Sequence, residues 1–129
     1  MGLKTYALKA LNSYYWWLDK LNKPAFIRQY PMFLRKLGVK INEKPGDCWI
    51  SPTIFLDSSG YDMIEIGDDC TISFDVVVLV HDYSINNAFR AVGIDAAERH
   101  RVIRRPVKIG RNCFIGARSI IMPGAVLGD

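Results

Sequence analysis

The stretches that decide the fold are IGDDCTISFDVV at residues 66–77 and IGRNCFIGARSIIMPGAVLGD at residues 109–129. In both, an aliphatic residue recurs every six positions, and a short residue, often glycine, follows it. The recurring residues are Ile50, Leu56, Ile66, Ile72, Val78, Ile109, Ile115, Ile121 and Leu127. A period of six excludes an α-helix and differs from the turn spacing of ordinary hairpins. It indicates a repeat of one short strand and one corner, with three repeats closing a coil of about 18 residues.

The position two residues before each aliphatic residue supports this register. It holds a small or apolar side chain in most repeats and a cysteine in three of them, Cys48, Cys70 and Cys113. Three thiols at one position of a repeat indicate small, buried packing residues. Their odd number argues against a closed disulfide framework and is typical of a reducing cytoplasm. We expect the glycine after the aliphatic residue to let the backbone turn each corner without strain.

Residues 3–37 have a helical period instead. Apolar side chains recur at spacings of three and four, at Leu3, Ala7, Leu11, Tyr14, Leu18 and Leu21. This pattern predicts an amphipathic helix. Pro24 suits the start of a second helix and Gly38 its end, while Pro31 predicts a break into two short turns. We expect the aromatic run at residues 14–17 to cover the end of the repeats or a partner subunit. A basic, aromatic helix that rests on a membrane surface is the alternative.

The repeats resemble those of the hexapeptide-repeat acyltransferases, and in particular the O-acetyltransferases that modify sugars, antibiotics and surface polysaccharides. The resemblance covers residues 46–129 in nine repeat units. It implies a mainly β protein, a left-handed parallel β-helix, preceded by a short α-helical segment at residues 1–45. The left-handedness of the β-helix is implied by the resemblance to this family, which is an exception to the rule of right-handed crossovers. Because family members are mostly homotrimers with active sites between adjacent subunits, we expect a homotrimer here.

Two interruptions of the register point to a site. Leu56 and Ile66, the next aliphatic residue of the period, are ten positions apart and enclose the turn-rich Asp57-Ser58-Ser59-Gly60. A longer insertion occupies residues 81–106. Insertions in repeat proteins emerge as loops on one face, often the binding face. This insertion looks like the catalytic loop of the family, in which the histidine that opens the loop is the general base. The resemblance assigns that role to His81.

A histidine suits this chemistry. Acyl transfer from a thioester to a hydroxyl needs a base that works near neutral pH, and imidazole does so without large tuning. The family transfers the acyl group directly, with acetyl-CoA as donor and no acyl-enzyme. Weaker candidates are Asp57, Asp82 and Phe114 for the substrate, and Gly116, Ala117 and Arg118 for the cofactor. Backbone N–H groups near Gly116 would stabilise the oxyanion, Asp57 would contact the substrate or orient the base, and Phe114 belongs either to the core or to the site. The alternative for His81 is a histidine merely hydrogen-bonded to backbone.

Composition limits the remaining partners. The chain has two histidines, His81 and His100, whereas hexapeptide zinc enzymes use three per metal, so we expect no metal and place His100 on the surface. The net charge of +4 is too small to indicate nucleic acid. A basic cluster suits the phosphates of CoA: Arg99, Arg101, Arg104, Arg105, Lys108, Arg111 and Arg118. With no membrane-spanning apolar run and no signal peptide, we expect a cytoplasmic protein, with membrane-surface contact through the N-terminal helix as a further expectation.

The sequence therefore predicts an O-acetyltransferase that moves an acetyl group from acetyl-CoA to a sugar or polysaccharide hydroxyl. The alternative is a non-catalytic β-helix scaffold for oligomerisation or binding. It is motivated by the end of the sequence at VLGD, within a repeat, where relatives continue into coils that line the CoA groove. The identity of the acceptor and the length of the acyl group stay open.

Overall fold

The computed structural model describes residues 3–94 and 101–129, with side chains from Ala10 onward. Two helices come first, α1 (Leu3–Leu21) and α2 (Lys23–Leu37). The next elements are β1 (Trp49–Ile50), β2 (Phe55–Leu56), the 3-10 turn η1 (Tyr61–Met63), β3 (Ile64–Ile66), β4 (Thr71–Ile72) and β5 (Val77–Val78). An insertion then holds β6 (His81–Asp82), α3 (Ile85–Ala91) and β7 (Ile103–Arg104). The last strands are β8 (Val107–Ile109), β9 (Phe114–Ile115), β10 (Ile120–Ile121) and β11 (Val126–Leu127).

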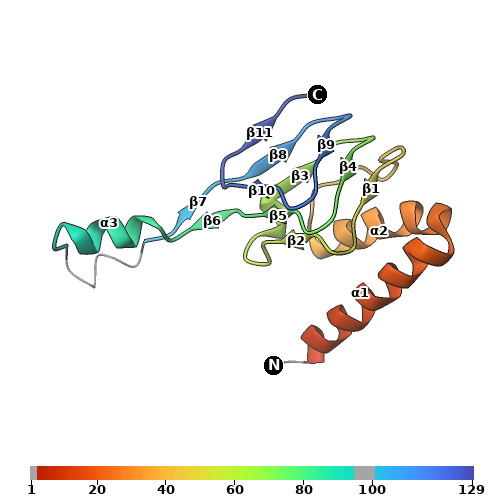
Figure 1. Ribbon diagram of the computed structural model, residues 1–129, viewed down its shortest axis with the longest axis horizontal. Helices are drawn as coiled ribbons and strands as arrows, with labels where there is room; N and C mark the ends of the chain where they lie inside the picture. The colour runs from red at the N-terminus through yellow and green to blue at the C-terminus, as the bar shows by residue number, and fades with distance from the viewer. Residues whose placement is uncertain (1–2, 95–100) are drawn as a thin grey trace.

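Nine of the described strands form three parallel sheets that the chain visits in strict rotation (Figure 1). We name them by their strand orders: sheet A is β3-β8-β11, sheet B is β1-β4-β9, and sheet C is β2-β5-β10. Lys108 pairs with Val126, 18 positions later, which confirms the predicted coil length where nothing interrupts the register. Trp49 pairs with Thr71, 22 positions later, because that coil contains the four extra residues before β3.

The aliphatic residues of the period point into a common core. Ile50, Ile72, Val78 and Ile109 have no exposed surface, and Ile66 is 2% exposed. These residues come from all three sheets and belong to one cluster of packed side chains. Burial of each such side chain stabilises the folded state by about 1.5 to 3 kcal/mol. The period of six is therefore confirmed as the spacing between successive core positions.

The glycines at the corners have a different purpose from the predicted one. A Cβ on Gly67 would lie 2.6 Å from the carbonyl carbon of Gly110, and a Cβ on Gly110 would lie 2.7 Å from that of Gly128. The left-handed backbone conformation occurs two residues after each glycine, at Asp69 and Asn112, each with φ 56°. Asp and Asn are among the residues that tolerate this conformation. The glycines thus let successive coils approach closely, and the following polar residue makes the turn.

Helix α2 covers the first coil. Its buried side chains Phe26, Tyr30 and Leu34 belong to the same core as the strands. The side chain of Asn22 caps its first turn by accepting a hydrogen bond from the N–H of Ala25. Gly38, with φ 116°, ends the helix as predicted.

The predicted break at Pro31 is wrong, because α2 runs through it without interruption. A proline inside a helix removes one backbone hydrogen bond and costs about 3 kcal/mol. Pro31 is itself buried beside the aromatic core of α2. Tertiary packing of that face therefore outweighs the local preference.

Helix α1 forms as predicted, but its predicted apolar face is largely uncovered. Leu11 is 41% exposed and Leu21 80% exposed. Contact with α2 is made instead by Tyr15, whose ring centroid lies 5.1 Å from that of Tyr30. In Figure 1, α1 diverges from the sheets toward its N-terminal end. None of the helices in residues 3–94 and 101–129 is long and apolar enough to span a membrane.

Candidate functional site

The candidate site lies where the chain leaves sheet C. Leu56 of β2 and Val78 of β5 are register partners in parallel strands. Residues that follow these two strands must therefore lie side by side. Asp57 follows β2 directly, and its N–H donates to Val78 O at 3.0 Å. His81 comes three residues after Val78 and opens the insertion, so the sheet brings the two side chains together.

His81 and Asp57 are in direct contact. The Nδ1 atom of His81 is hydrogen-bonded to Oδ2 of Asp57. The same Oδ2 accepts from the N–H of Val80 at 3.0 Å, and Oδ1 accepts from the N–H of Ser59 at 3.0 Å. The side chain of Asp57 is 4% exposed and that of His81 is 29% exposed. Because Nδ1 is engaged by the carboxylate, Nε2 is the nitrogen left to exchange a proton with a substrate.

The environment keeps Asp57 ionised. Burial alone raises the pKa of a carboxyl group, since it disfavours the charged form. For Asp57 this effect is outweighed by hydrogen bonds from Ser59, the Val80 N–H and His81, which hold its pKa below the ordinary value. A carboxylate fixed in this way orients the imidazole and would stabilise it when it gains a proton.

Two further residues complete the arrangement. The sequence indicated Arg104 only as one member of the basic cluster, and it did not indicate Ser59 as a site residue. Ser59 Oγ lies 3.0 Å from His81 Nδ1. Arg104 Nη1 donates to both the carbonyl oxygen and the Oγ of Ser59, each at 3.3 Å. Arg104 lies beside His81 because β7 pairs antiparallel with β6, in a register that makes the two residues partners. The turn composition around Ser59 and the basic cluster around Arg104 were visible in the sequence, but the pairing that joins them was not.

The described residues of the insertion, 81–94 and 101–106, form a structured arm. Strands β6 and β7 lead away from the coils and carry α3 beyond them (Figure 1). The side chain of Asn86 links α3 to the segment before β7. Its Oδ1 accepts from the N–H of Arg101 at 3.1 Å, and its Nδ2 donates to Arg101 O at 3.0 Å. Arg99 and His100 lie outside the described residues. The arm therefore leaves the sheets at the position of His81.

Asp82 directly follows His81 in β6, whereas the other predicted site residues belong to β9 and to the corner before β10. The carboxylate of Asp82 accepts from the N–H and hydroxyl of Ser84, at 2.7 and 2.9 Å, which stabilises a turn. Phe114 is 74% exposed on β9, so it is not a core residue. Gly116, Ala117 and Arg118 precede β10, whereas Asp57 and His81 follow β2 and β5. Because the strands of sheet C are parallel, these three residues lie at its opposite end.

The thiols are engaged in packing. Cys70 Sγ donates to Gly110 O at 3.0 Å, and Cys113 Sγ donates to Gly128 O at 3.1 Å, in the next coil each time. Burial raises the pKa of Cys48 to about 12. Thiolates are the nucleophilic form of cysteine, so buried Cys48 is inert at neutral pH. Across the described part of the chain, no three His, Cys, Asp or Glu side chains gather as metal ligands would.

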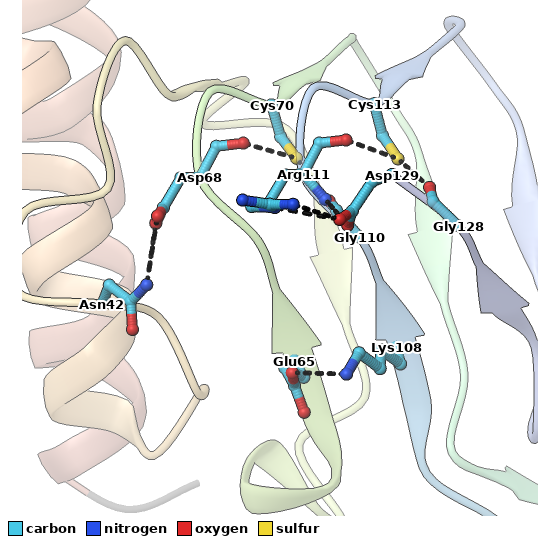
Figure 2. A network of polar contacts seen from close by, with 10 residues as sticks. All are labelled: Asn42, Glu65, Asp68, Cys70, Lys108, Gly110, Arg111, Cys113, Gly128 and Asp129. Carbon is cyan, nitrogen blue, oxygen red and sulfur yellow. Dashed lines mark hydrogen bonds and ion pairs between the residues drawn. The ribbon is translucent and has the colours of Figure 1, made fainter.

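A cavity of about 670 Å³ lies over sheet A, and His81 is not part of its lining. Figure 2 shows the polar contacts of several residues that line it. Two ion pairs lie in its wall. Lys108 Nζ lies 3.3 Å from Glu65, and Arg111 donates to Asp129 at 2.7 Å. Paired surface charges of this kind stabilise little. We therefore place the candidate site at His81, where a partly exposed base is held by a buried carboxylate.

Comparison with known proteins agrees with the strand topology. No curated protein and no solved structure gives a significant match to the chain. Residues 106–129, which contain β8 to β11, match the family model of the hexapeptide repeat of succinyl-transferase. This match supports the hexapeptide-repeat acyltransferase family for the chain.

Proposed function

We propose that this protein is an O-acetyltransferase that transfers an acetyl group from acetyl-CoA to a hydroxyl of a sugar or polysaccharide. The observation that carries the proposal is the contact between His81 and the buried, ionised Asp57 at the mouth of the insertion. The hexapeptide-repeat match supports acyl transfer as the class of reaction. The proposed architecture is a left-handed β-helix, and the free thiols are consistent with a cytoplasmic location.

In the proposed reaction, His81 acts as general base. Nε2 takes the proton of the acceptor hydroxyl while the hydroxyl oxygen attacks the thioester carbonyl carbon. The tetrahedral intermediate then collapses, the C–S bond breaks, and the sulfur of CoA leaves. His81 returns its proton to that sulfur, so the enzyme ends in its starting state. Asp57 stabilises the imidazolium between the two proton transfers.

The proposed donor site uses basic residues of the arm. Arg104 hydrogen-bonds to Ser59 beside His81, and Arg105 packs over Gly124, 3.0 Å from where a Cβ there would lie. Guanidinium groups bind phosphates with good geometry, so these residues suit the phosphates of CoA. The position of Gly116, Ala117 and Arg118 at the far end of sheet C means that they would serve His81 only from a neighbouring subunit.

A homotrimer is therefore part of the proposal. The outward side chains of sheet C, Phe55, Val77 and Ile120, are register partners across its three strands. Phe55 is 55% and Ile120 62% exposed, which leaves an apolar row uncovered in the single chain. The outward face of sheet A is instead charged, with Glu65 paired to Lys108. Exposed apolar patches of this kind are typical of protein interfaces.

The test is release of free CoA thiol from acetyl-CoA in the presence of a panel of sugar acceptors. We expect His81→Ala to lower the rate by a factor of about 10² to 10⁴, because it removes the base. His100→Ala changes the other histidine of the chain and serves as the matched control. Full activity of His81→Ala, or equal loss in both variants, would contradict the assigned role.

A further inference from the structure

An apolar cavity of about 380 Å³ lies behind the turn that holds His81. It lies between α1, α2 and β2, and its lining includes Tyr30, Phe33, Leu37 and Tyr61. Its volume falls in the range of small-molecule sites, about 300 to 1,000 Å³. An apolar cavity bounded by aromatic side chains favours a ligand with an apolar part.

The cavity borders directly on the site. Ser58 lines it, and the residues on either side of Ser58, Asp57 and Ser59, are those that contact His81. Burial, and then the negative charge of Asp57, raise the pKa of Tyr61, so the phenol of this wall lies within electrostatic reach of the site carboxylate. A ligand that fills the cavity therefore ends at the turn that orients the base.

Away from the turn at Ser58, the cavity continues along α1 toward Trp16 and Trp17. Asn12 of α1 lines it and lines a second cavity, of the same volume, beside Trp16 and Trp17. The opposite wall is formed by consecutive residues, with 52–53 in the second cavity and 54–55 in the first. Together the two cavities make a groove between α1 and the β1–β2 turn. At its outer end, Lys20 Nζ lies 5.9 Å from the ring centroid of Trp16. Exposed tryptophans with a nearby lysine are typical of the boundary between lipid and water.

We propose that this groove binds the apolar tail of the acceptor, which is then an amphiphile with a sugar head and an alkyl chain. The inference rests on the proposed function, since it names the class of acceptor for the same site. A molecule with an apolar chain and a hydroxyl-bearing head matches a groove whose inner cavity is mainly apolar and borders the turn that contacts His81. A second copy of the chain, or membrane lipid held in a bilayer, would be a different occupant.

The test is a binding titration without acyl donor. Decyl maltoside, below its critical micelle concentration, is compared with methyl maltoside, which has the same head and no tail. We expect saturable, one-to-one binding of decyl maltoside, at least about tenfold tighter than that of methyl maltoside, because its methylene groups leave water.

Variants at Asn12 locate the binding. Asn12 is exposed, so substitutions there leave the core intact. We expect Asn12→Leu to tighten binding of decyl maltoside and Asn12→Glu to weaken it by roughly tenfold, because a charge in the groove must be desolvated. Ala10→Glu is the matched control, since residue 10 lies on the opposite side of α1 and outside the groove. It should bind like the parent.

Three results would overturn the inference: equal binding of both maltosides, equal binding by the parent and Asn12→Glu, or binding of anionic vesicles without binding of monomeric decyl maltoside. The last result would indicate that the groove and its tryptophans contact a membrane surface instead. Failure of the proposed function is distinguishable, because a chain that binds decyl maltoside in this groove but cleaves no acetyl-CoA retains the tail site and loses the reaction.

Discussion

At the scale of single residues, Asp57 links the site to stability. Its pKa is held below the ordinary value, so the folded state favours the ionised carboxylate. A group with a depressed folded pKa contributes stability that is present above its unfolded pKa, about 3.9, and lost as the pH falls through the folded value. Between those two pH values the unfolded chain binds more protons, and stability therefore rises with pH.

We predict that Asp57→Asn removes this contribution. Chemical denaturation of parent and variant at several pH values between neutral and strongly acid measures it. The difference in unfolding free energy should be largest above about pH 4 and should shrink as the pH falls below that value. A difference that does not change with pH would show that Asp57 is not held ionised by its partners.

Glycine at a corner gives a second prediction at this scale. Gly110→Ala places a Cβ 2.7 Å from the backbone of the next coil, which requires the coils to separate. We expect a loss of roughly 1 to 3 kcal/mol in unfolding free energy, as for other overpacked sites. Gly116→Ala is the matched control at the same position of a later repeat, because its Cβ would find its nearest neighbour 4.0 Å away. Equal stability of the two variants in thermal unfolding would contradict the close-approach argument.

At the scale of elements, the period of six was sufficient to predict which residues face the core. An interior of stacked coils has one aliphatic position per strand, and that position is visible in a single sequence at Ile66, Ile72 and Ile109. Breaks in the same regularity marked Asp57 and the insertion, and the structure places both at the ends of the paired strands β2 and β5. The resemblance to the family's catalytic loop led to His81, and the structure adds that the buried carboxylate beside it is Asp57.

Other features depend on contacts that leave no periodic signal. The approach of Arg104 to Ser59 requires a pairing of β6 with β7 across more than twenty residues of insertion. The continuity of α2 at Pro31 depends on burial against the core, which propensity does not include. Helix α1 contacts α2 through Tyr15, whereas Leu11 of its predicted apolar face is 41% exposed.

At the scale of the whole molecule, the uncovered row on sheet C predicts an assembly. We expect Ile120→Arg to weaken or abolish the trimer, because a buried, unpaired guanidinium is costly at an interface. Val126→Arg is the matched control, since Val126 is 72% exposed on sheet A, beside Lys108. Sedimentation velocity measures both. A parent that sediments as a monomer, or equal dissociation in both variants, would contradict the assignment of sheet C.

The central claim is that the chain uses the donor acetyl-CoA, and a calorimetric titration of the 129-residue protein with acetyl-CoA tests it most directly. The account predicts saturable binding with a dissociation constant between about 1 μM and 1 mM, the range of ordinary enzyme substrates. A stable assembly that binds no acetyl-CoA at millimolar concentration would contradict it and would favour a β-helix scaffold instead.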